Sequence, residues 1–510
     1  MESKVLIHNA IKNKIDKIAI ISNNREITYS EFFENFSSLG SFLKNRLAAS
    51  SRIGMILKNS IEAAETMYAC SHAEMILVPL DFNIQLKNLE YIVNDCEVSL
   101  IITNERIYRK FKDYFEAQKI AVLLIEDFKE NKKNILHLAG SGLQTFSNNA
   151  NIATILYTTG TTGPKKGVML GHDTLIEASK NINDFMQIGD WVVESSPMPL
   201  SHSFGFARMR CVLESGGTLI LEDSFIRPEK ILYNMKKYNA NGLSSVPTGF
   251  SIMLKCFFSV FKEVAQNIKY IEIGSAFMRD KYKQHLMQLM PQARLCMHYG
   301  LTEASRACFI NFNSEKDYLH TVGRPSPNVD VEIRDKKGVS LGRNEVGQIY
   351  IKGKMLLKGY WKKDDLFKKN YRDNWFNSND IGMIDDNGYI HLYGRKDDIM
   401  NIGGLKVAPG EVEEIILKHP EIAEVAVVGF KNEDDISNET IASFIVPNSS
   451  DFTLNIESLQ KFCLQFLEPY KIPKQMEIVK ELPKTNSGKI QRHLLKENER
   501  TLLYDKRKNI

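Results

Sequence analysis

The stretch from Ile152 to Val168 reads IATILYTTGTTGPKKGV. Its first six residues form an apolar run that predicts a buried strand. The ten residues after Tyr157 contain three glycines, four threonines and two lysines. Glycines let a backbone turn tightly and bring its amides close to an anion, and the hydroxyl and ammonium groups add donors and charge. The stretch therefore predicts a polyphosphate-binding loop directly after a strand, with a polar surface turn as the alternative. It is not a Walker A loop, because no Gly-Lys-Ser/Thr sequence occurs.

The composition is that of a globular protein with more than one domain. The chain has 510 residues, 43% hydrophobic and 25% charged, a length typical of roughly two to four folding units. The excess of 66 basic over 62 acidic residues is too small to indicate nucleic-acid binding. Seven cysteines without C-x-x-C spacing favour reduced thiols over a disulfide framework or a metal site. No apolar run reaches the ~20 residues that cross a bilayer, so we expect a cytoplasmic protein without a transmembrane segment.

Strand-like and helix-like patterns alternate through most of the chain. Arg52–Leu57, Met75–Pro79 and Val98–Thr103 are typical of strands, and the segments between them are typical of helices. This alternation predicts an α/β fold with parallel sheets and helices on their faces. Thr28 and Glu31 fit a capping box at the start of a helix.

The pattern changes after about residue 320. Val329–Arg334, Gly347–Gly353 and Gly388–Leu392 predict short strands of a small β-rich subdomain, either a barrel or a distorted sheet. A charged stretch then interrupts the pattern, and a helix opening at Pro409 begins another α/β unit. We therefore expect a large N-terminal domain over residues 1–394, with the β-rich subdomain at about 320–394, a hinge at 395–398, and a small C-terminal α/β domain over 399–510.

At Tyr157–Val168 the chain resembles the AMP-forming adenylating enzymes, a superfamily of acyl-CoA synthetases, peptide-synthetase adenylation domains and luciferases. Their loop has the pattern Tyr-Thr-Ser-Gly-Thr-Thr-Gly-x-Pro-Lys-Gly-Val, from which this chain departs with Thr159 for Ser and Lys165 for Pro. The resemblance implies that the loop binds the phosphates of ATP. The implied phosphate-binding residues are Thr158, Thr159, Gly160, Thr161, Thr162, Gly163 and Lys166.

Further motifs follow in the family's order. In the segment HYGLTE the resemblance implies that Tyr299 packs on adenine, Thr302 bonds the α-phosphate and Glu303 holds Mg²⁺. A hard cation takes oxygen ligands, which suits a carboxylate. Without the motif, Glu303 would be interpreted as an acidic residue at a helix N-terminus. The other residues implied at the adenine end of the site are Gly274, Ser275, Ala276, His298 and Gly300.

The ribose and the second half-reaction are assigned to the C-terminal third. Asp380 resembles the aspartate that accepts both ribose hydroxyls, although Asn379 stands where the family has Gly; Arg395 and Tyr393 are implied at the same edge. Members of the family rotate a mobile C-terminal domain about a pivot, which Asp397 matches. The loop implied on the thiol side contains Gly403, Gly404 and Lys406, and the motif PKTNSGKIQR places the adenylation lysine at Lys489.

The acyl pocket is the least defined part of the prediction. In the segment PMPLSHSFG, His202 matches a residue that borders the acyl group, and Gly205 stands where amino-acid-activating relatives carry aspartate, which weighs against an α-amino acid. The other residues expected near the pocket are Ser203, Phe204, Thr248, Ala304 and Ser305. Three arginines, Arg208, Arg210 and Arg306, either bind a second carboxylate or form structural ion pairs.

The resemblance implies an ATP-dependent carboxylic acid–CoA ligase that acts through an acyl-adenylate and releases AMP and pyrophosphate. Its implied catalytic residues are Lys489, Thr302, Glu303 and His202, and its cofactors are ATP, Mg²⁺ and CoA. The alternative acceptor is the phosphopantetheine of a separate carrier protein, which would then be a partner beside the small carboxylic acid. A third possibility is an inactive nucleotide-binding relative. The sequence names neither the acid nor the acceptor.

Overall fold

The computed structural model describes residues 11, 13–130, 135–136, 151–158, 165–274, 276, 278–396, 398–402, 405–430, 439–449, 455–484 and 490–496, with the backbone alone at 135–136 and 406. The chain forms two compact units. The first comprises residues 1–160, 164–330 and 351–376, and the second comprises residues 161–163, 331–350 and 377–510.

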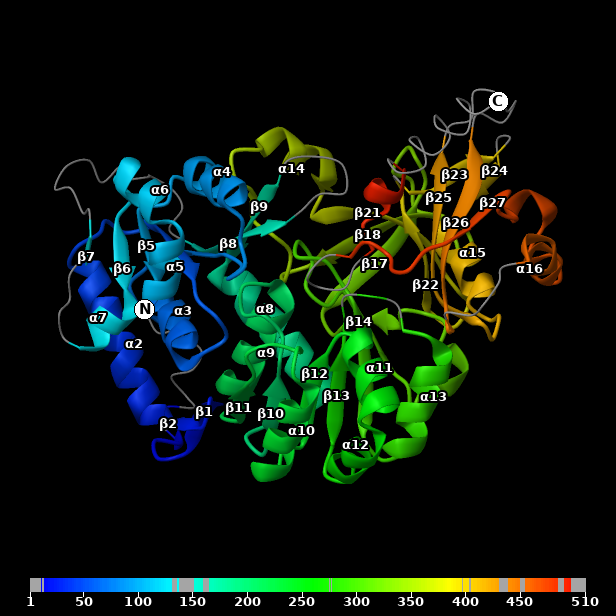
Figure 1. Ribbon diagram of the computed structural model, residues 1–510. Coiled ribbons are helices and arrows are strands. Elements are labelled where there is room, and N and C mark those ends of the chain that lie inside the picture. The colour runs from blue at the N-terminus through cyan, green and yellow to red at the C-terminus, as the bar shows by residue number, and fades with distance from the viewer. Residues whose placement is uncertain are drawn as a thin grey trace. The chain divides into compact units, whose positions relative to one another are not determined.

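A nine-stranded sheet belongs to the first unit (Figure 1). Its six central strands run parallel, and antiparallel strands close both edges. In spatial order the strands are β16 (Arg324–Pro325), β15 (Cys308–Asn311), β14 (Arg294–Tyr299), β13 (Tyr270–Ile273), β12 (Gly242–Ser245), β10 (Val193–Ser196), β11 (Thr218–Leu221), β1 (Ile18–Ser22) and β2 (Arg25–Thr28).

A second sheet in the same unit has eight strands and carries the predicted phosphate loop. Five of its strands run parallel, and β9, β19 and β7 are antiparallel to their neighbours. In spatial order they are β19 (Gly359–Tyr360), β9 (Lys166–Gly171), β8 (Ile152–Thr158), β4 (Ile76–Pro79), β3 (Arg52–Ile56), β5 (Leu100–Thr103), β6 (Val122–Leu124) and β7 (Ile135–Leu136).

Helices cover both faces of both sheets, as the alternating pattern predicts. One hydrophobic core joins the facing sides of the two sheets through α2 (Tyr29–Lys44), α3 (Ile61–His72), α7 (Ile125–Lys129), α8 (His172–Met186) and α9 (Ser203–Glu214). The outer face of the nine-stranded sheet packs on α10 (Pro228–Lys237), α11 (Pro247–Cys256), α12 (Phe258–Ala265) and α13 (Asp280–Leu289). The outer face of the eight-stranded sheet packs on α4 (Leu86–Cys96), α5 (Glu105–Lys110) and α6 (Lys112–Ala117).

Burial on both faces explains why the strands read as continuous apolar runs. On β1, Ile20 belongs to the shared core and Ile21 to the outer core, because successive side chains of a strand point to opposite faces. The predicted capping box is confirmed at α2. The Thr28 hydroxyl accepts from the Glu31 amide at 3.2 Å, and the Glu31 carboxylate accepts from the Thr28 amide at 2.7 Å.

The predicted β-rich segment forms a five-stranded sheet. Its strands are β17 (Val329–Arg334), β18 (Gly347–Gly353), β21 (Trp375–Ile384) and β20 (Tyr371–Arg372), with β22 (Ile390–Arg395) paired to β21; the helix α14 (Asp364–Asn370) precedes β20. The strands found at Val329–Arg334 and Gly347–Gly353 have the predicted bounds.

The C-terminal α/β pattern is also confirmed. A three-stranded sheet of β25 (Ile422–Phe430), β26 (Thr440–Pro447) and β27 (Gln475–Ile478) packs with α15 (Pro409–Ile416) and α16 (Ile456–Cys463), and β23 (Met400–Ile402) pairs with β24 (Leu405–Val407). Residues 331–350 and 377–396 group with these elements in the second unit, so the compact units do not divide at residue 394. The hinge at 395–398 stays a prediction.

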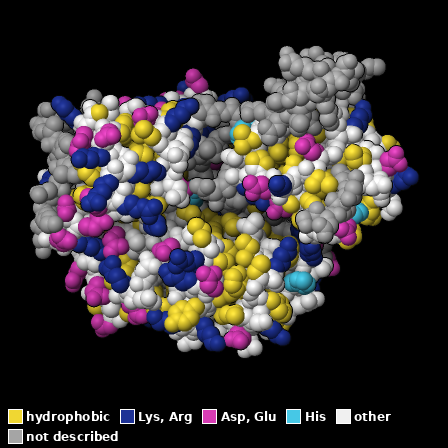
Figure 2. All heavy atoms as spheres, viewed as in Figure 1, with side chains coloured by type: hydrophobic (Ala, Val, Ile, Leu, Met, Phe, Trp, Pro, Cys, Tyr) yellow, Lys and Arg dark blue, Asp and Glu magenta, His cyan; other side chains and the backbone are white. Residues whose placement is uncertain are grey.

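The surface is mixed in charge. On the face shown in Figure 2, Lys and Arg side chains stand interspersed with Asp and Glu side chains, in agreement with a net charge of only +4. Among the helices that the structure describes, none is long and apolar enough to pass through a bilayer.

Candidate active site

Helix α4 anchors both ends of the predicted phosphate loop. The Tyr157 hydroxyl donates to the Asp95 carboxylate at 2.5 Å, and the Tyr91 hydroxyl donates to the Lys165 carbonyl at 2.8 Å. Thr159, Gly160, Thr161, Thr162 and Gly163 lie outside the described residues. At the loop's entrance, the buried hydroxyl of Thr158 has no hydrogen-bond partner within the described part of the chain. A buried hydroxyl without a partner is unfavourable, so this group is suited to a ligand.

Lys166 and Glu303 come together at the loop's exit. The Lys166 ammonium lies 3.0 Å from Glu303 Oε1, and the Tyr360 hydroxyl donates to the same oxygen at 3.0 Å. Glu303 is 7% exposed and Tyr360 only 1%. Burial by itself would raise the pKa of Glu303, but the charge and hydrogen bond of Lys166 outweigh it and hold the pKa below its ordinary value. Glu303 is therefore a carboxylate, as a cation ligand must be.

Glu303 lies in a turn and not at a helix N-terminus. The alternative interpretation, in which Glu303 is an acidic residue that stabilises a helix N-terminus, is therefore wrong. The turn is tightly closed: a Cβ on Gly300 would lie 2.5 Å from the Arg306 amide nitrogen. Arg306 itself has φ +50°, a left-handed conformation that few non-glycine residues adopt. Glu303 thereby lies next to the segment of β19, where its carbonyl accepts from the Leu357 amide at 2.9 Å.

A buried ionic network centred on Glu272 contacts this turn. Glu272 on β13 accepts from Arg306 Nε at 3.0 Å, and its other oxygen lies 3.0 Å from Arg208 Nη1. His298 Nδ1 lies 2.6 Å from Glu272 Oε1, and burial lowers the pKa of His298. The imidazole closes over the end of β13, where a Cβ on Gly274 would lie 2.1 Å from its ring. Glycine is therefore required where the sequence predicts the adenine-binding strand end.

All three arginines considered for a second carboxylate are engaged in ion pairs. Arg208 binds Glu194 and Glu272, and Arg306 binds Glu272. Arg210 lies 3.4 Å from Glu214 and donates to the carbonyl of Leu175. The structural alternative therefore accounts for these residues.

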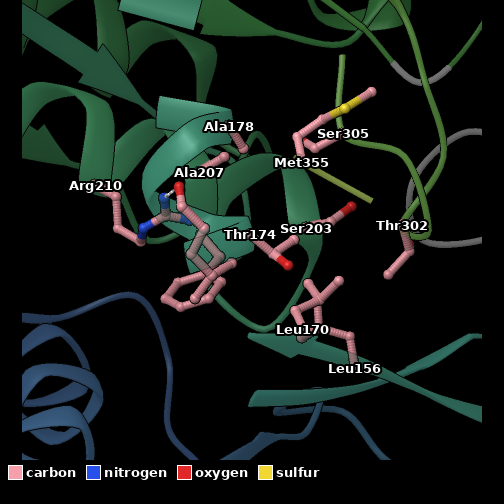
Figure 3. A pocket seen from close by; sticks show the side chains of 12 residues that line it. Leu156, Leu170, Thr174, Ala178, Ser203, Ala207, Arg210, Thr302, Ser305 and Met355 are labelled. Carbon is pink, nitrogen blue, oxygen red and sulfur yellow. Dashed lines mark hydrogen bonds between the residues drawn. The ribbon is translucent and has the colours of Figure 1, made fainter. Parts of the chain in front are cut away.

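A small pocket lies beside Thr302, next to β8, β9, α8 and α9 (Figure 3). In Figure 3, Thr302 and Arg210 lie on opposite sides of it. Of the residues expected to line or approach the acyl pocket, Ser203 and Ser305 line this cavity, whereas Phe204, Thr248 and Ala304 do not. The other lining residues are Leu156, Leu170, Thr174, Leu175, Ala178, Phe206, Ala207 and Met355. Most of these side chains are apolar; all come from β8, β9, α8 and α9 except Met355, which lies in the turn after β18.

His202 is placed at the start of α9 but does not line this pocket. Its Nε2 lies 3.5 Å from Asp81 Oδ2, on the loop that follows β4. No local pattern singles out Asp81, because the two residues meet only when the two sheets are packed together.

In the second unit, Asp380 and Arg395 meet across β21 and β22. They are partners in the antiparallel register, and Arg395 Nη1 donates to Asp380 Oδ1 at 3.0 Å and to the Ser378 carbonyl at 2.7 Å. Asn379 has φ +59°, which explains why glycine is the family's usual residue and why asparagine is acceptable there. Tyr393 also lies on β22, the strand that contacts helix α15.

The C-terminal motif is anchored on both sides of its lysine. Lys484 and Ile490 form an antiparallel bridge, and Arg492 makes a two-oxygen ion pair with Glu413 on α15 at 2.7 and 2.9 Å. The remaining predicted residues on this side, Lys489, Asp397, Gly403 and Gly404, lie outside the described residues, as does Ser275 in the first unit. Lys406 lies on β24, where only the backbone is described, and Ala276 lies in a bend after β13. Their functional roles stay predictions.

Comparison with known proteins identifies the family. Residues 7–361 match the AMP-binding enzyme family, and residues 411–489 match the AMP-binding enzyme C-terminal domain. The chain belongs to the AMP-binding enzyme family. It is an AMP-forming acid–thiol ligase, as the resemblance implies.

The relatives of the enzyme align over nearly its whole length. A long-chain-fatty-acid–CoA ligase of Bacillus subtilis (strain 168) is 29% identical, over 95% of this chain and 92% of that protein. A 2-succinylbenzoate–CoA ligase of Bacillus licheniformis is 26% identical, over 94% of this chain and 96% of that protein. The crystal structure of ATP-bound MatB from Rhodopseudomonas palustris is 26% identical, covers 97% of this chain and 99% of its own, and superposes with a TM-score of 0.86. The predicted fold class, a large α/β domain followed by a small C-terminal domain, is confirmed.

Proposed function

We propose that the enzyme joins a carboxylic acid to CoA through an acyl-adenylate, at the site formed by Lys166, Glu303 and the neighbouring pocket. The observation that carries this proposal is the position of Thr302. It lines an apolar pocket and directly precedes Glu303, which is paired with the loop lysine. An acid bound in the pocket would thus present its carboxylate beside the phosphate-binding groups. We assign the reaction to the cytoplasm, since the free cysteines suit a reducing compartment.

The apolar walls of the pocket favour a monocarboxylic acid with an apolar acyl group, and the cavity of about 20 Å³ has to widen to admit one. Its walls are mainly leucine, alanine, phenylalanine and methionine side chains, and the guanidinium of Arg210 is bound to Glu214 and Leu175. A second carboxylate would have to compete with these internal contacts, at the cost of leaving a buried carboxylate unpaired. The name of the Bacillus subtilis relative, a long-chain-fatty-acid ligase, points to the same class of acid.

Glu303 suits Mg²⁺ because it is negatively charged and because Mg²⁺ needs few ligands from the protein. Its carboxylate already carries a cation at 3.0 Å, the ammonium of Lys166. No cluster of three or more metal-binding side chains occurs in the described ranges. Mg²⁺ is commonly held by one or two carboxylates together with substrate phosphates. Bound there, the metal would neutralise charge on the phosphates.

The first step has to overcome repulsion between an anion and a polyanion. The acid's carboxylate oxygen attacks the α-phosphorus of ATP, a new P–O bond forms, and the bond to the departing pyrophosphate breaks. No side chain is needed as a nucleophile, so catalysis rests on position and charge. In this proposal Lys166 and the loop bind the phosphates, Thr302 bonds the α-phosphate, and Lys489 bridges the carboxylate and that phosphate. Asp380 and Arg395 would bind the ribose.

In the second step the thiol of CoA attacks the acyl carbon, loses its proton, and releases AMP. The loop with Gly403, Gly404 and Lys406 is proposed to meet the thiol arm after the C-terminal domain turns about Asp397. Such a rotation is a candidate for the slow step of turnover.

The test is ATP–pyrophosphate exchange with a panel of fatty, aryl, dicarboxylic and amino acids, followed by thioester formation with CoA or carrier proteins. Lys489→Ala is expected to abolish exchange and to leave thioester formation from a preformed acyl-adenylate largely intact. Lys484→Ala is the matched control, because this lysine lies in the same motif but pairs with Glu424 at 2.6 Å. Absence of exchange with every acid would refute the proposed chemistry. Exchange by the Lys489 variant at the parent rate would refute the lysine's role, and transfer only to a carrier protein would refute CoA as the acceptor.

A further inference from the structure

Tyr360 lies between the two charged side chains of the nucleotide site. Its hydroxyl is 3.0 Å from Glu303 Oε1 and 3.5 Å from Lys166 Nζ, and the same ammonium lies 4.7 Å from the centroid of its ring. Lys166 is thus held by a carboxylate and an aromatic face at once. Nothing in the sequence singled out Tyr360, since Gly359-Tyr360-Trp361 carries no charge and matches none of the motifs considered.

The backbone around Tyr360 is fixed to both predicted nucleotide motifs. Tyr360 pairs with Val168 on β9, and the Trp361 amide donates to the Gly167 carbonyl at 2.8 Å. On the other side the Leu357 amide donates to the Glu303 carbonyl at 2.9 Å. The Trp361 indole adds a hydrogen bond to the Asp95 carbonyl at 2.8 Å. The tyrosine is therefore held in place by neighbours other than the Lys166 side chain.

The phosphates of ATP would compete with Glu303 for the three N–H donors of the Lys166 ammonium. When the phosphates attract Lys166, the Glu303 carboxylate loses its cation partner. The Glu303 carboxylate keeps its hydrogen bond from the Tyr360 hydroxyl. That bond fixes the position of Oε1 while the carboxylate binds a new cation. Ligating carboxylates are oriented by such hydrogen bonds, and loss of the partner group weakens metal binding.

We propose that Tyr360 is a positioning residue that fixes the Glu303 carboxylate for the divalent cation of bound ATP. This inference rests on the proposed function, because it assumes that Glu303 and Lys166 share a Mg–ATP complex. A purely structural Tyr360 would serve through its ring, which fills a fully buried space. The two roles separate in Tyr360→Phe, which keeps the ring and removes only the hydroxyl.

The experiment measures binding in the full chain by calorimetry, with ATP in EDTA and with ATP in excess Mg²⁺. The ratio of the two dissociation constants reports how strongly the metal contributes. For Tyr360→Phe we expect the Mg–ATP dissociation constant to rise about tenfold, as for loss of one hydrogen bond to a charged group. Metal-free ATP should bind within twofold of the parent, and the Tm should stay close to the parent's.

Two further variants make the test selective. Tyr29→Phe is the matched control. This tyrosine is buried too, its hydroxyl hydrogen is shared between the carbonyls of Leu213 and Gly217, and it contacts none of the proposed nucleotide-site residues, so the ratio should not change. In Glu303→Gln, which removes the proposed metal ligand, adding Tyr360→Phe should cost less than the tenfold it costs in the parent. The inference is overturned if Tyr360→Phe keeps the parent's ratio or weakens both forms of ATP equally. Failure of the parent to bind ATP would instead overturn the proposed function.

Discussion

Arg306 joins the turn that carries Glu303 to a wall of the pocket beside Thr302. Its Nε donates to Glu272 at 3.0 Å, and its two Nη atoms donate to the carbonyls of Ser203 and Phe204 at 3.4 and 3.3 Å. The residue is 3% exposed. We predict that Arg306→Met lowers both stability and affinity for the acid, because one side chain holds both segments.

The expected loss of folding stability depends on the partners that Glu272 keeps when Arg306 is replaced. Breaking a buried ion pair by removal of one partner costs about 3–5 kcal/mol. Glu272 keeps Arg208 at 3.0 Å and His298 at 2.6 Å, so we expect the lower end, about 3 kcal/mol. A unit of several hundred residues loses ~1.4 °C of Tm per kcal/mol, which gives a fall of about 4 °C. Release of the two carbonyls should raise the KM for the acid, while KM for ATP changes less.

The assay combines thermal unfolding with pyrophosphate-exchange kinetics at varied acid. Arg109→Met serves as the control, since this arginine pairs with Glu105 on the surface with its side chain 75% exposed, and such pairs contribute little. In a double-mutant cycle, Glu272→Gln combined with Arg306→Met should cost less than the sum of the single variants. Additive losses, or a Tm fall no larger than the control's, would refute the reasoning.

Two other perturbations test separate parts of the molecule. Asp397→Pro, placed at the predicted pivot, should suppress thioester formation and spare pyrophosphate exchange; equal loss of both would contradict a pivot. Burial raises the pKa of Glu222 to about 7, although the side chains of Asn234 and Ser195 donate to it. In the folded state Glu222 keeps its proton at pH values above its ordinary pKa of 4.5. Its contribution to the free energy of unfolding therefore falls as pH rises from about 4.5 to 7. Glu222→Gln should therefore raise the Tm at pH 8 and not at pH 4.5, and an equal change at both pH values would contradict the assignment.

Local sequence patterns predict much of the observed fold and the candidate nucleotide-binding residues. Thr28 and Glu31 predict the start of a helix, because a capping box needs only two residues that are three positions apart. The strand ending at Thr158 was readable because burial on both faces makes a continuous apolar run. The phosphate-binding loop is also predicted from a local pattern, because its glycines and threonines are adjacent in the sequence. Asn379 was noticed only as a departure from the family, and its left-handed backbone explains the departure.

The sequence by itself determined the fold class and the family and predicted the phosphate-binding loop, since each depends on short spacings and on residue types in order. Only the tertiary structure decided which side chains act together. Tyr360 reaches Glu303 across 57 positions of sequence, and Arg306 reaches Glu272 across 34. It also decided that the three arginines are engaged in ion pairs. Such contacts arise when separate strands and loops pack into one core, and no local periodicity records the pairing of residues that far apart.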